Sequence, residues 1–101
     1  MLTNRHSYSA TNDFINAMRY MPNVTLLGDK SGGGSGLPFT SELPNGWIVR
    51  FSASPHLDAD KQHIEFGIDP DIKMDMDTVA AYERQIDTLI EEARSLLQVK
   101  P

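Results

Sequence analysis

The chain has 101 residues, enough for one small domain or for part of a larger one. Its formal net charge of −5 is unevenly spread, because residues 51–101 hold eleven of the fourteen acidic side chains. An acidic chain without a basic stripe argues against nucleic-acid binding, which needs clustered lysine and arginine. The absence of cysteine excludes disulfides, thiolate catalysis and cysteine-ligated zinc.

Membrane insertion and secretion have no support in the sequence itself. No apolar run approaches the ~20 residues of a membrane span. Residues 1–4 lead directly into polar sequence, without the apolar core of a signal peptide. The chain by itself is therefore expected in the cytoplasm, unless another segment precedes it.

The first 27 residues read as strand, helix and strand. Residues 1–5 resemble the end of a strand, and residues 13–21 a short helix closed by Pro22. The short apolar run 24–27 predicts a buried strand. The helix has one apolar face, made by Phe14, Ala17 and Met18.

Ser9 lies at the junction between the first strand and this helix, within residues 8–12. A serine there has its hydroxyl beside free backbone N–H groups and the positive end of the helix dipole. Nucleophilic serines often occupy such sites, because the N–H groups also stabilise an oxyanion. Serine is equally favoured there as an ordinary N-cap, so the local pattern leaves both interpretations open.

A glycine-rich loop follows, with five of the seven glycines between positions 28 and 36. Its composition fits a linker, a phosphate cradle or a loop that a substrate backbone approaches closely. The phosphate-binding motif fails, because no Gly-Lys-Ser/Thr ends the run. A linker would separate self-sufficient units, and the 27 residues before it are too few for one. We favour the functional loop.

Residues 39–43 and 47–53 predict a hairpin, since Asn45-Gly46 between them tolerates positive φ at both positions. Residues 63–66 suggest a brief strand, and residues 67–72 are rich in turn formers.

Residues 77–98 predict one long helix with a continuous apolar stripe. The stripe is expected to face the core, although its spacing also permits a partner-helix seam. The predicted order is β-α-β-loop-β-β-loop-α, an α/β architecture with few strands for its apolar surface, as in a piece of a larger sheet. The stripe comprises Val79, Tyr82, Ile86, Leu89, Ile90, Ala93, Leu96 and Leu97.

Isolated polar residues give little functional signal. The three histidines lack the spacing of a zinc site. His6 precedes Ser9 by three residues and could lie near it, but a surface position is expected for it. Four aspartates between positions 69 and 77 lack the central glycine and terminal glutamate of a calcium loop, so solvated or helix-capping roles are expected. Neither a metal nor another cofactor is predicted. Glu65 alone carries no signal.

Taken together, three segments resemble the C-terminal processing (tail-specific) serine peptidases and their tricorn-core and retinoid-binding-protein-like relatives. The segments are Asn4–Phe14, then Val24–Gly36 followed by Leu43–Trp47, and then Gly67–Ile72, which is similar to a Gly-Val-x-Pro-Asp-Ile signature. The resemblance implies a partial crotonase/ClpP-like peptidase core. Residues 1–101 would form the C-terminal portion of a catalytic domain, with no PDZ domain present.

The resemblance also implies site residues. Ser9 corresponds to the nucleophile, the Ala10 backbone N–H to one oxyanion donor, and Gly32, Gly33 and Gly34 to a substrate-binding loop. In the Ser–Lys branch a lysine stands where Gly34 does here, and Lys30 lies four residues too early. The absence of a lysine at position 34 favours the tricorn-like branch, in which a histidine far upstream is the base and a glutamate completes the site. Glu65 is the candidate for that glutamate, and neither His6 nor His63 matches the base.

The function implied is that of a serine endopeptidase that cleaves extended polypeptides through an acyl-enzyme on Ser9. Without its base, the chain is expected to be inactive alone and to self-associate through uncovered apolar edges. For the full-length protein, the resemblance suggests the cell envelope or periplasm. The alternative is a non-enzymatic module that binds a peptide or small apolar ligand near Phe39, Trp47 and Phe51.

Overall fold

The computed structural model describes residues 1–98 and has a mixed α/β architecture, as predicted. Residues 99–101, part of the predicted domain, lie outside the described residues. The elements are β1 (Leu2–Thr3), α1 (Ala10–Met18), β2 (Leu27–Gly28), β3 (Pro38–Glu42), β4 (Ile48–Ser52), β5 (Ile72–Lys73), α2 (Thr78–Arg84) and α3 (Thr88–Gln98).

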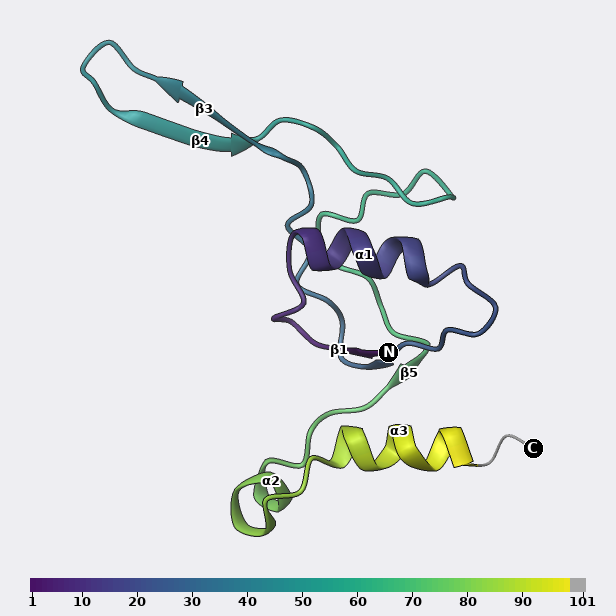
Figure 1. The fold of residues 1–101 in the computed structure, drawn as a ribbon. Coiled ribbons are helices and arrows are strands. Elements are labelled where there is room, and N and C mark those ends of the chain that lie inside the picture. The colour runs from purple at the N-terminus through teal and green to yellow at the C-terminus, as the bar shows by residue number, and fades with distance from the viewer. Residues whose placement is uncertain (99–101) are drawn as a thin grey trace.

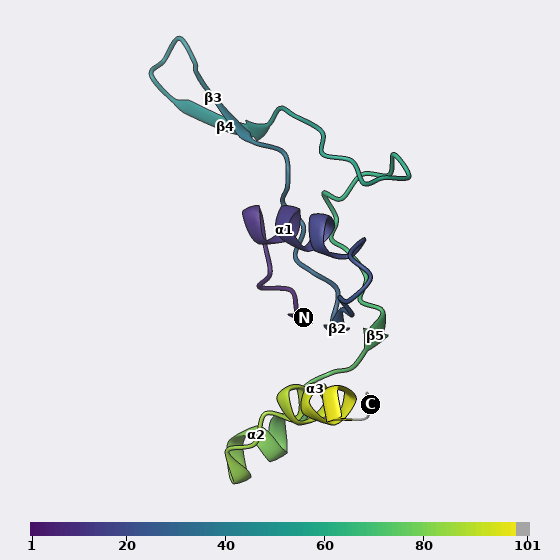
Figure 2. The ribbon, with the colours of Figure 1, turned by 45° about the vertical axis from the view of Figure 1, so that its right-hand side comes forward.

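Three short parallel strands form a small sheet in the order β1-β2-β5. Leu27 of the central strand pairs with Leu2 on one side and with Ile72 on the other. A Cβ atom at Gly28 would lie 2.2 Å from the Thr3 carbonyl oxygen, so only glycine allows this approach. In both views α1 and α3 lie on opposite sides of the sheet (Figures 1 and 2).

The hydrophobic core is small and lies on the α1 side of the sheet. It consists of Ile15, Leu26, Ile64 and Ile68, with Val24 packed against it. The Cα radius of gyration is 17.5 Å, whereas a compact domain of this length has about 13 Å. The described chain is therefore open, and many large apolar side chains remain exposed.

The predicted hairpin is confirmed as β3 and β4, which pair antiparallel from Pro38–Ser52 to Glu42–Ile48. Every residue of both strands is exposed. The Phe39 and Phe51 rings, directly opposite in the register, have centroids 5.5 Å apart. In both views the hairpin projects away from the sheet and its helices (Figures 1 and 2).

Two strand predictions were wrong in their bounds or position. Residues 24–26 are not in a strand, and the Leu26 N–H donates to the Asp71 carboxylate at 2.7 Å instead. Residues 63–66 form no strand, since His63 makes only an isolated bridge to Leu57. The turn-rich sequence before residue 72 concealed β5, which is only two residues long.

The first helix begins at Ala10, three residues earlier than predicted, and buries a different face. Asn12 and Ile15 point into the core, whereas Phe14 of the predicted apolar face is 56% exposed. Periodicity misled here because a buried asparagine occupies a position that the pattern reads as polar and solvent-facing.

The prediction of a single helix over residues 77–98 was wrong, because two helices, α2 and α3, form in its place. Gln85 takes the left-handed conformation that ends α2. The Asp87 carboxylate then accepts the N–H groups of Leu89 and Ile90, which begins α3. Asp77 caps α2 in the same way, because its carboxylate accepts the N–H groups of Val79 and Ala80. Helix capping was one of the two roles expected for the aspartates between positions 69 and 77. The break also divides the predicted stripe, in which Tyr82 is 84% exposed and Leu89 is buried.

Within residues 1–98, none of the helices combines the length and apolar character needed to cross a membrane.

Candidate active site

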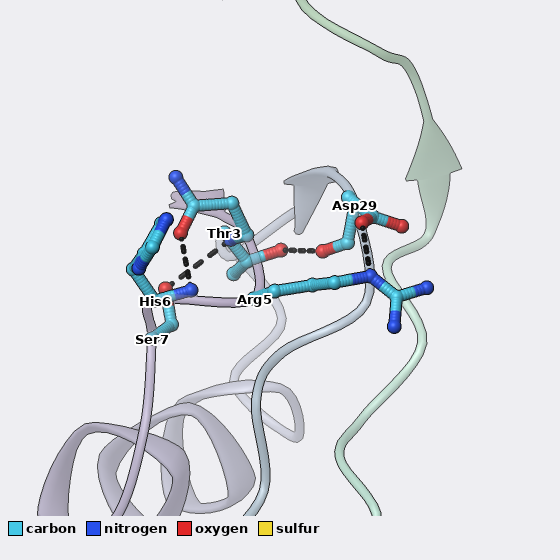
Figure 3. Close-up of polar contacts among 6 residues, drawn as sticks. Thr3, Arg5, His6, Ser7 and Asp29 are labelled. Atoms are coloured by element: carbon cyan, nitrogen blue, oxygen red, sulfur yellow. Dashed lines mark hydrogen bonds and ion pairs between the residues drawn. The ribbon is translucent and has the colours of Figure 1, made fainter.

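The turn that leads to Ser9 is fixed by polar contacts to the end of β2 (Figure 3). The Thr3 hydroxyl donates to the Asp29 carbonyl oxygen at 2.8 Å, and Arg5 Nε donates to the Asp29 carboxylate at 3.0 Å. The Lys30 backbone N–H, helped by Arg5, holds the pKa of Asp29 below its ordinary value. The turn is closed by the Asn4 carboxamide, which accepts the His6 N–H at 2.8 Å.

Ser9 has a backbone conformation that a simple helix cap does not need. Its φ of 57° and ψ of −121° lie outside the extended region of ordinary N-caps, and its side chain makes no capping hydrogen bond. The side-chain cap, one of the two interpretations that the sequence left open, is therefore not formed at Ser9. Positive φ in a non-glycine residue stores about 1–3 kcal/mol of strain, which is commonest at functional sites. The Ser9 side chain is exposed at the start of α1.

The Ala10 backbone N–H has the position expected of an anion donor. Ala10 is the first residue of α1, so its N–H lacks an acceptor within the helix and lies at the positive end of the helix dipole.

The glycine loop brings the sequence-predicted residues together. The Ser9 N–H donates to the Gly33 carbonyl oxygen at 2.8 Å, and the Gly32 N–H donates to the Ser7 carbonyl oxygen at 2.9 Å. On its other side, the Gly34 N–H donates to the Glu65 carbonyl oxygen at 2.9 Å. The loop thus lies between the segment that carries Ser9 and the segment that carries Glu65.

Glycine is required in this loop by space as well as by conformation. Gly33 has φ of +74°, and a Cβ atom there would lie 2.0 Å from the Glu65 carbonyl oxygen. A Cβ atom at Gly34 would lie 2.0 Å from the Tyr8 ring. The Tyr8 ring thus fills the space into which a lysine at position 34 would project.

A buried polar network beneath Ser9 was missed by the sequence interpretation. Asn12 is fully buried; its Nδ2 donates to Ser35 Oγ at 2.8 Å and to the Ile64 carbonyl oxygen at 2.9 Å. Its Oδ1 accepts the Ser31 hydroxyl at 2.6 Å, and Ser31 Oγ accepts the Ile68 N–H at 2.7 Å. The one signal for this network in the sequence was Ser31 and Ser35, which flank the three glycines of the loop. Serines at these positions are compatible with buried, hydrogen-bonded hydroxyls as well as with a linker.

Glu65 lies half-buried beside a shallow pocket of about 300 Å³ at the base of the hairpin. Its Oε2 is 3.2 Å from the position that a Cβ atom of Gly36 would occupy. The carboxylate therefore points toward the end of the glycine loop. The pocket is lined by Ser52, Ala53, Ser54, Pro55, His56, His63 and Glu65.

His56, to which the sequence assigned no role, is paired with α1. Its Nδ1 lies 2.9 Å from Asp13 Oδ1. Partial burial raises the pKa of Asp13, but hydrogen bonds from His56 and Ser35 and the charge of His56 outweigh it, so the pKa is lowered overall. An ionised carboxylate only accepts hydrogen bonds, so we assign the Nδ1 proton to His56.

The remaining predicted polar residues lie at the surface. His6 is exposed, as expected, and His63 is exposed as well. Lys30 forms an ion pair with Asp69, with 3.7 Å between Nζ and Oδ2. Among the described residues, no three histidine, aspartate or glutamate side chains gather as a possible metal site.

Together, the strained serine at a helix N-terminus and the first N–H of the helix beside it resemble the arrangement found in hydrolases with a serine nucleophile. The sequence model of peptidase family S41 matches residues 1–74, which contain all of these site residues. The chain belongs to peptidase family S41, and the family resemblance predicted from the sequence is confirmed.

Solved structures agree with this assignment. A candidate peptidase from Parabacteroides merdae is 62% identical, with a TM-score of 0.92 over 99% of this chain and 31% of its own. Mature CPAF, with lactacystin and in a second structure, is 18% identical, with TM-scores of 0.63 and 0.62. Those matches cover 71% of this chain and 15% and 14% of CPAF, and they show the fold alone. A search among curated proteins gave no match.

The chain spans about a third of the Parabacteroides merdae protein and a smaller share of CPAF. Its fold therefore matches part of a peptidase domain of this family.

Proposed function

We propose that the chain supplies the nucleophile of a serine endopeptidase that cleaves extended polypeptides through an acyl-enzyme on Ser9. The observation that carries the proposal is the Ser9 backbone, which is strained and makes no side-chain cap at the start of α1. A serine that only capped the helix would not need this conformation.

In this mechanism Ser9 Oγ attacks the scissile carbonyl carbon and loses its proton to a histidine base. The oxyanion of the tetrahedral intermediate accepts a hydrogen bond from the Ala10 N–H. The C–N bond then breaks, the amine leaves with the proton taken from Ser9, and water hydrolyses the acyl-enzyme. The base and the second oxyanion donor are assigned to a part of the catalytic domain that precedes this sequence.

Glu65 and the glycine loop are assigned supporting roles. Glu65 would stabilise the histidine base, and the proposal rests on its link to Ser9 through Gly33 and Gly34. The N–H groups of Gly32 and Gly34 are engaged within the protein, so the loop offers a substrate mainly close approach without side chains. Tail-specific cleavage, typical of the resembling family, is part of the proposal.

The chain alone is proposed to be inactive, because a serine hydroxyl is a weak nucleophile without an adjacent base. The test compares the 101-residue chain with the full-length protein on an unstructured fluorogenic polypeptide. Turnover is expected only in the full-length protein, and Ser9→Ala should abolish it. Ser95→Ala, an exposed serine in α3, is the matched control and should keep full turnover. Turnover by the short chain that Ser9→Ala removes would contradict the inactivity.

A second candidate is a binding module without catalysis, favoured by the exposed aromatic face of the hairpin. Phe39 and Phe51 are each about half exposed and Trp47 is 70% exposed. Labelling by a fluorophosphonate separates the two candidates, since it requires an activated serine. Labelling of the full-length protein that Ser9→Ala abolishes supports the peptidase, whereas an unlabelled protein that binds apolar peptides supports the module.

Self-association of the isolated chain is also proposed. The open shape and exposed apolar residues such as Leu2 and Tyr82 support it. Light scattering should show a mass that rises with concentration and falls in Tyr82→Lys. A strict monomer at high concentration would contradict it.

A further inference from the structure

The loop from His56 to Ile64 is attached to α1 at both of its ends. His56 Nδ1 meets Asp13 at 2.9 Å, and the Ile64 carbonyl oxygen accepts Asn12 Nδ2 at 2.9 Å. In the turn that follows α1, the Tyr20 hydroxyl accepts the Ala59 N–H from the middle of the loop at 3.1 Å. The helix that begins immediately after Ser9 therefore holds both ends of this loop, and the turn after the helix holds its middle.

Both ends of the loop converge near Glu65. The Ile64 N–H donates to the His56 carbonyl oxygen at 3.2 Å, so the loop is closed on itself just before Glu65. His56 and Glu65 also line the same pocket. A displacement of His56 would thus be transmitted to the residue beside Glu65.

We propose that the Asp13–His56 pair is a positioning device, which sets the segment carrying Glu65 in register with the helix carrying Ser9. The inference rests on the proposed peptidase function and adds to it two residues that support the site without touching the substrate. Asn12 fixes the backbone at Ile64, and the Asp13–His56 pair fixes the opposite end of the same loop.

The geometry gives His56 a restraining role. Its Nδ1–H is bound by a carboxylate on a helix, one turn after Ser9. The Ser35 side chain, at the end of the glycine loop, also lowers the pKa of Asp13. The ionisable groups around the imidazole are Asp13 on α1, and His63 and Glu65 in the pocket. A misplacement of catalytic groups by ~1 Å can reduce a rate about 10²-fold.

The test measures kcat and KM of the full-length protein on the unstructured polypeptide. His56→Ala and Asp13→Ala should each lower kcat about tenfold with little change in KM, and the double variant should be no worse than either. His56→Asn keeps a donor at the δ position and should restore kcat to within about threefold of the wild type. His56→Gln moves the amide to the ε position and should stay low.

Tyr20→Phe is the matched control, because it removes a contact of the same loop away from Glu65 and should leave kcat unchanged. Thermal unfolding identifies any variant that fails to fold. If His56→Ala or Asp13→Ala fails to fold, the kcat of His56→Asn decides whether the pair has a positioning role.

An inert wild type would overturn the proposed function and this inference with it. An active wild type with unchanged kcat in His56→Ala overturns the positioning role alone. An His56→Asn variant as poor as His56→Ala also overturns it, since the imidazole itself would then be needed in the chemistry.

Discussion

The segment around α1 and the β3–β4 hairpin are built by opposite means. Around α1, buried polar bonds from Asn12 and backbone bonds from Gly33 and Gly34 fix three chain segments to one another. In the hairpin, backbone pairing and one aromatic contact hold two strands that are exposed throughout. The comparison shows that the candidate site lies where several independent hydrogen bonds fix the chain, whereas the side chains of the hairpin are exposed to solvent.

The largest expected difference between the two regions comes from their glycines. Gly33→Ala forces a Cβ atom against the Glu65 carbonyl oxygen at positive φ, and should lower the free energy of unfolding by about 3 kcal/mol or more. Gly46→Ala in the hairpin turn meets no atom within 4 Å, and should lower it by only about 1 kcal/mol. Urea unfolding of both variants measures the difference, and equal losses would refute it.

The next effect separates two asparagines of α1. Asn12→Ala leaves the Ser31 and Ser35 hydroxyls and the Ile64 carbonyl oxygen without their partner, and should destabilise by about 2–3 kcal/mol. Asn16→Ala removes a buried Oδ1 that has no hydrogen-bond partner among residues 1–98, and should be neutral or slightly stabilising. The same substitution on the same helix controls for helix propensity. A similar loss in both variants would mean that the Asn12 network contributes no stability of its own.

The sequence predicted what depends on local chemistry. Asn45-Gly46 predicted the hairpin, because its conformational demand is local. Ser9 and the glycine loop were identified through the family resemblance. Their contact in the structure is a direct backbone hydrogen bond from the Ser9 N–H to the Gly33 carbonyl oxygen.

The errors came from residues whose role depends on distant partners. Asn12 reads as a solvent-facing polar residue until Ser31, Ser35 and Ile64 surround it. Asp87 reads as one more charge on a long helix until it begins a new one. His56 had no signal, since Asp13 lies 43 residues away in the sequence.

The hairpin should unfold without the core, which sharpens the comparison between regions. Phe51→Ala removes its aromatic pair, which contributes about 0.5–1.5 kcal/mol to the hairpin. Hydrogen exchange should therefore quicken at β3 and β4 while the amides of Leu27 and Ile68 keep their protection. Ile15→Ala, in the core, is the matched control. It should lower the free energy of unfolding by about 2–5 kcal/mol and therefore speed hydrogen exchange throughout the chain. A global change in Phe51→Ala would show that the hairpin and core unfold as one unit.

The smallest expected effect is acid sensitivity of the α1 region. The pKa of Asp13 is lower in the folded chain than its ordinary value of 3.8, so its contribution to stability is present above that pH. The contribution is lost as the pH falls through the lower folded value, because the protonated carboxyl no longer pairs as an anion with His56. Asp13→Asn should therefore lose less stability than the wild type between about pH 4 and pH 2. Asp60→Asn, an exposed loop aspartate, should follow the wild-type curve. Urea midpoints across this pH range measure the effect, and parallel curves for Asp13→Asn and the wild type would show that the Asp13–His56 pair adds no stability.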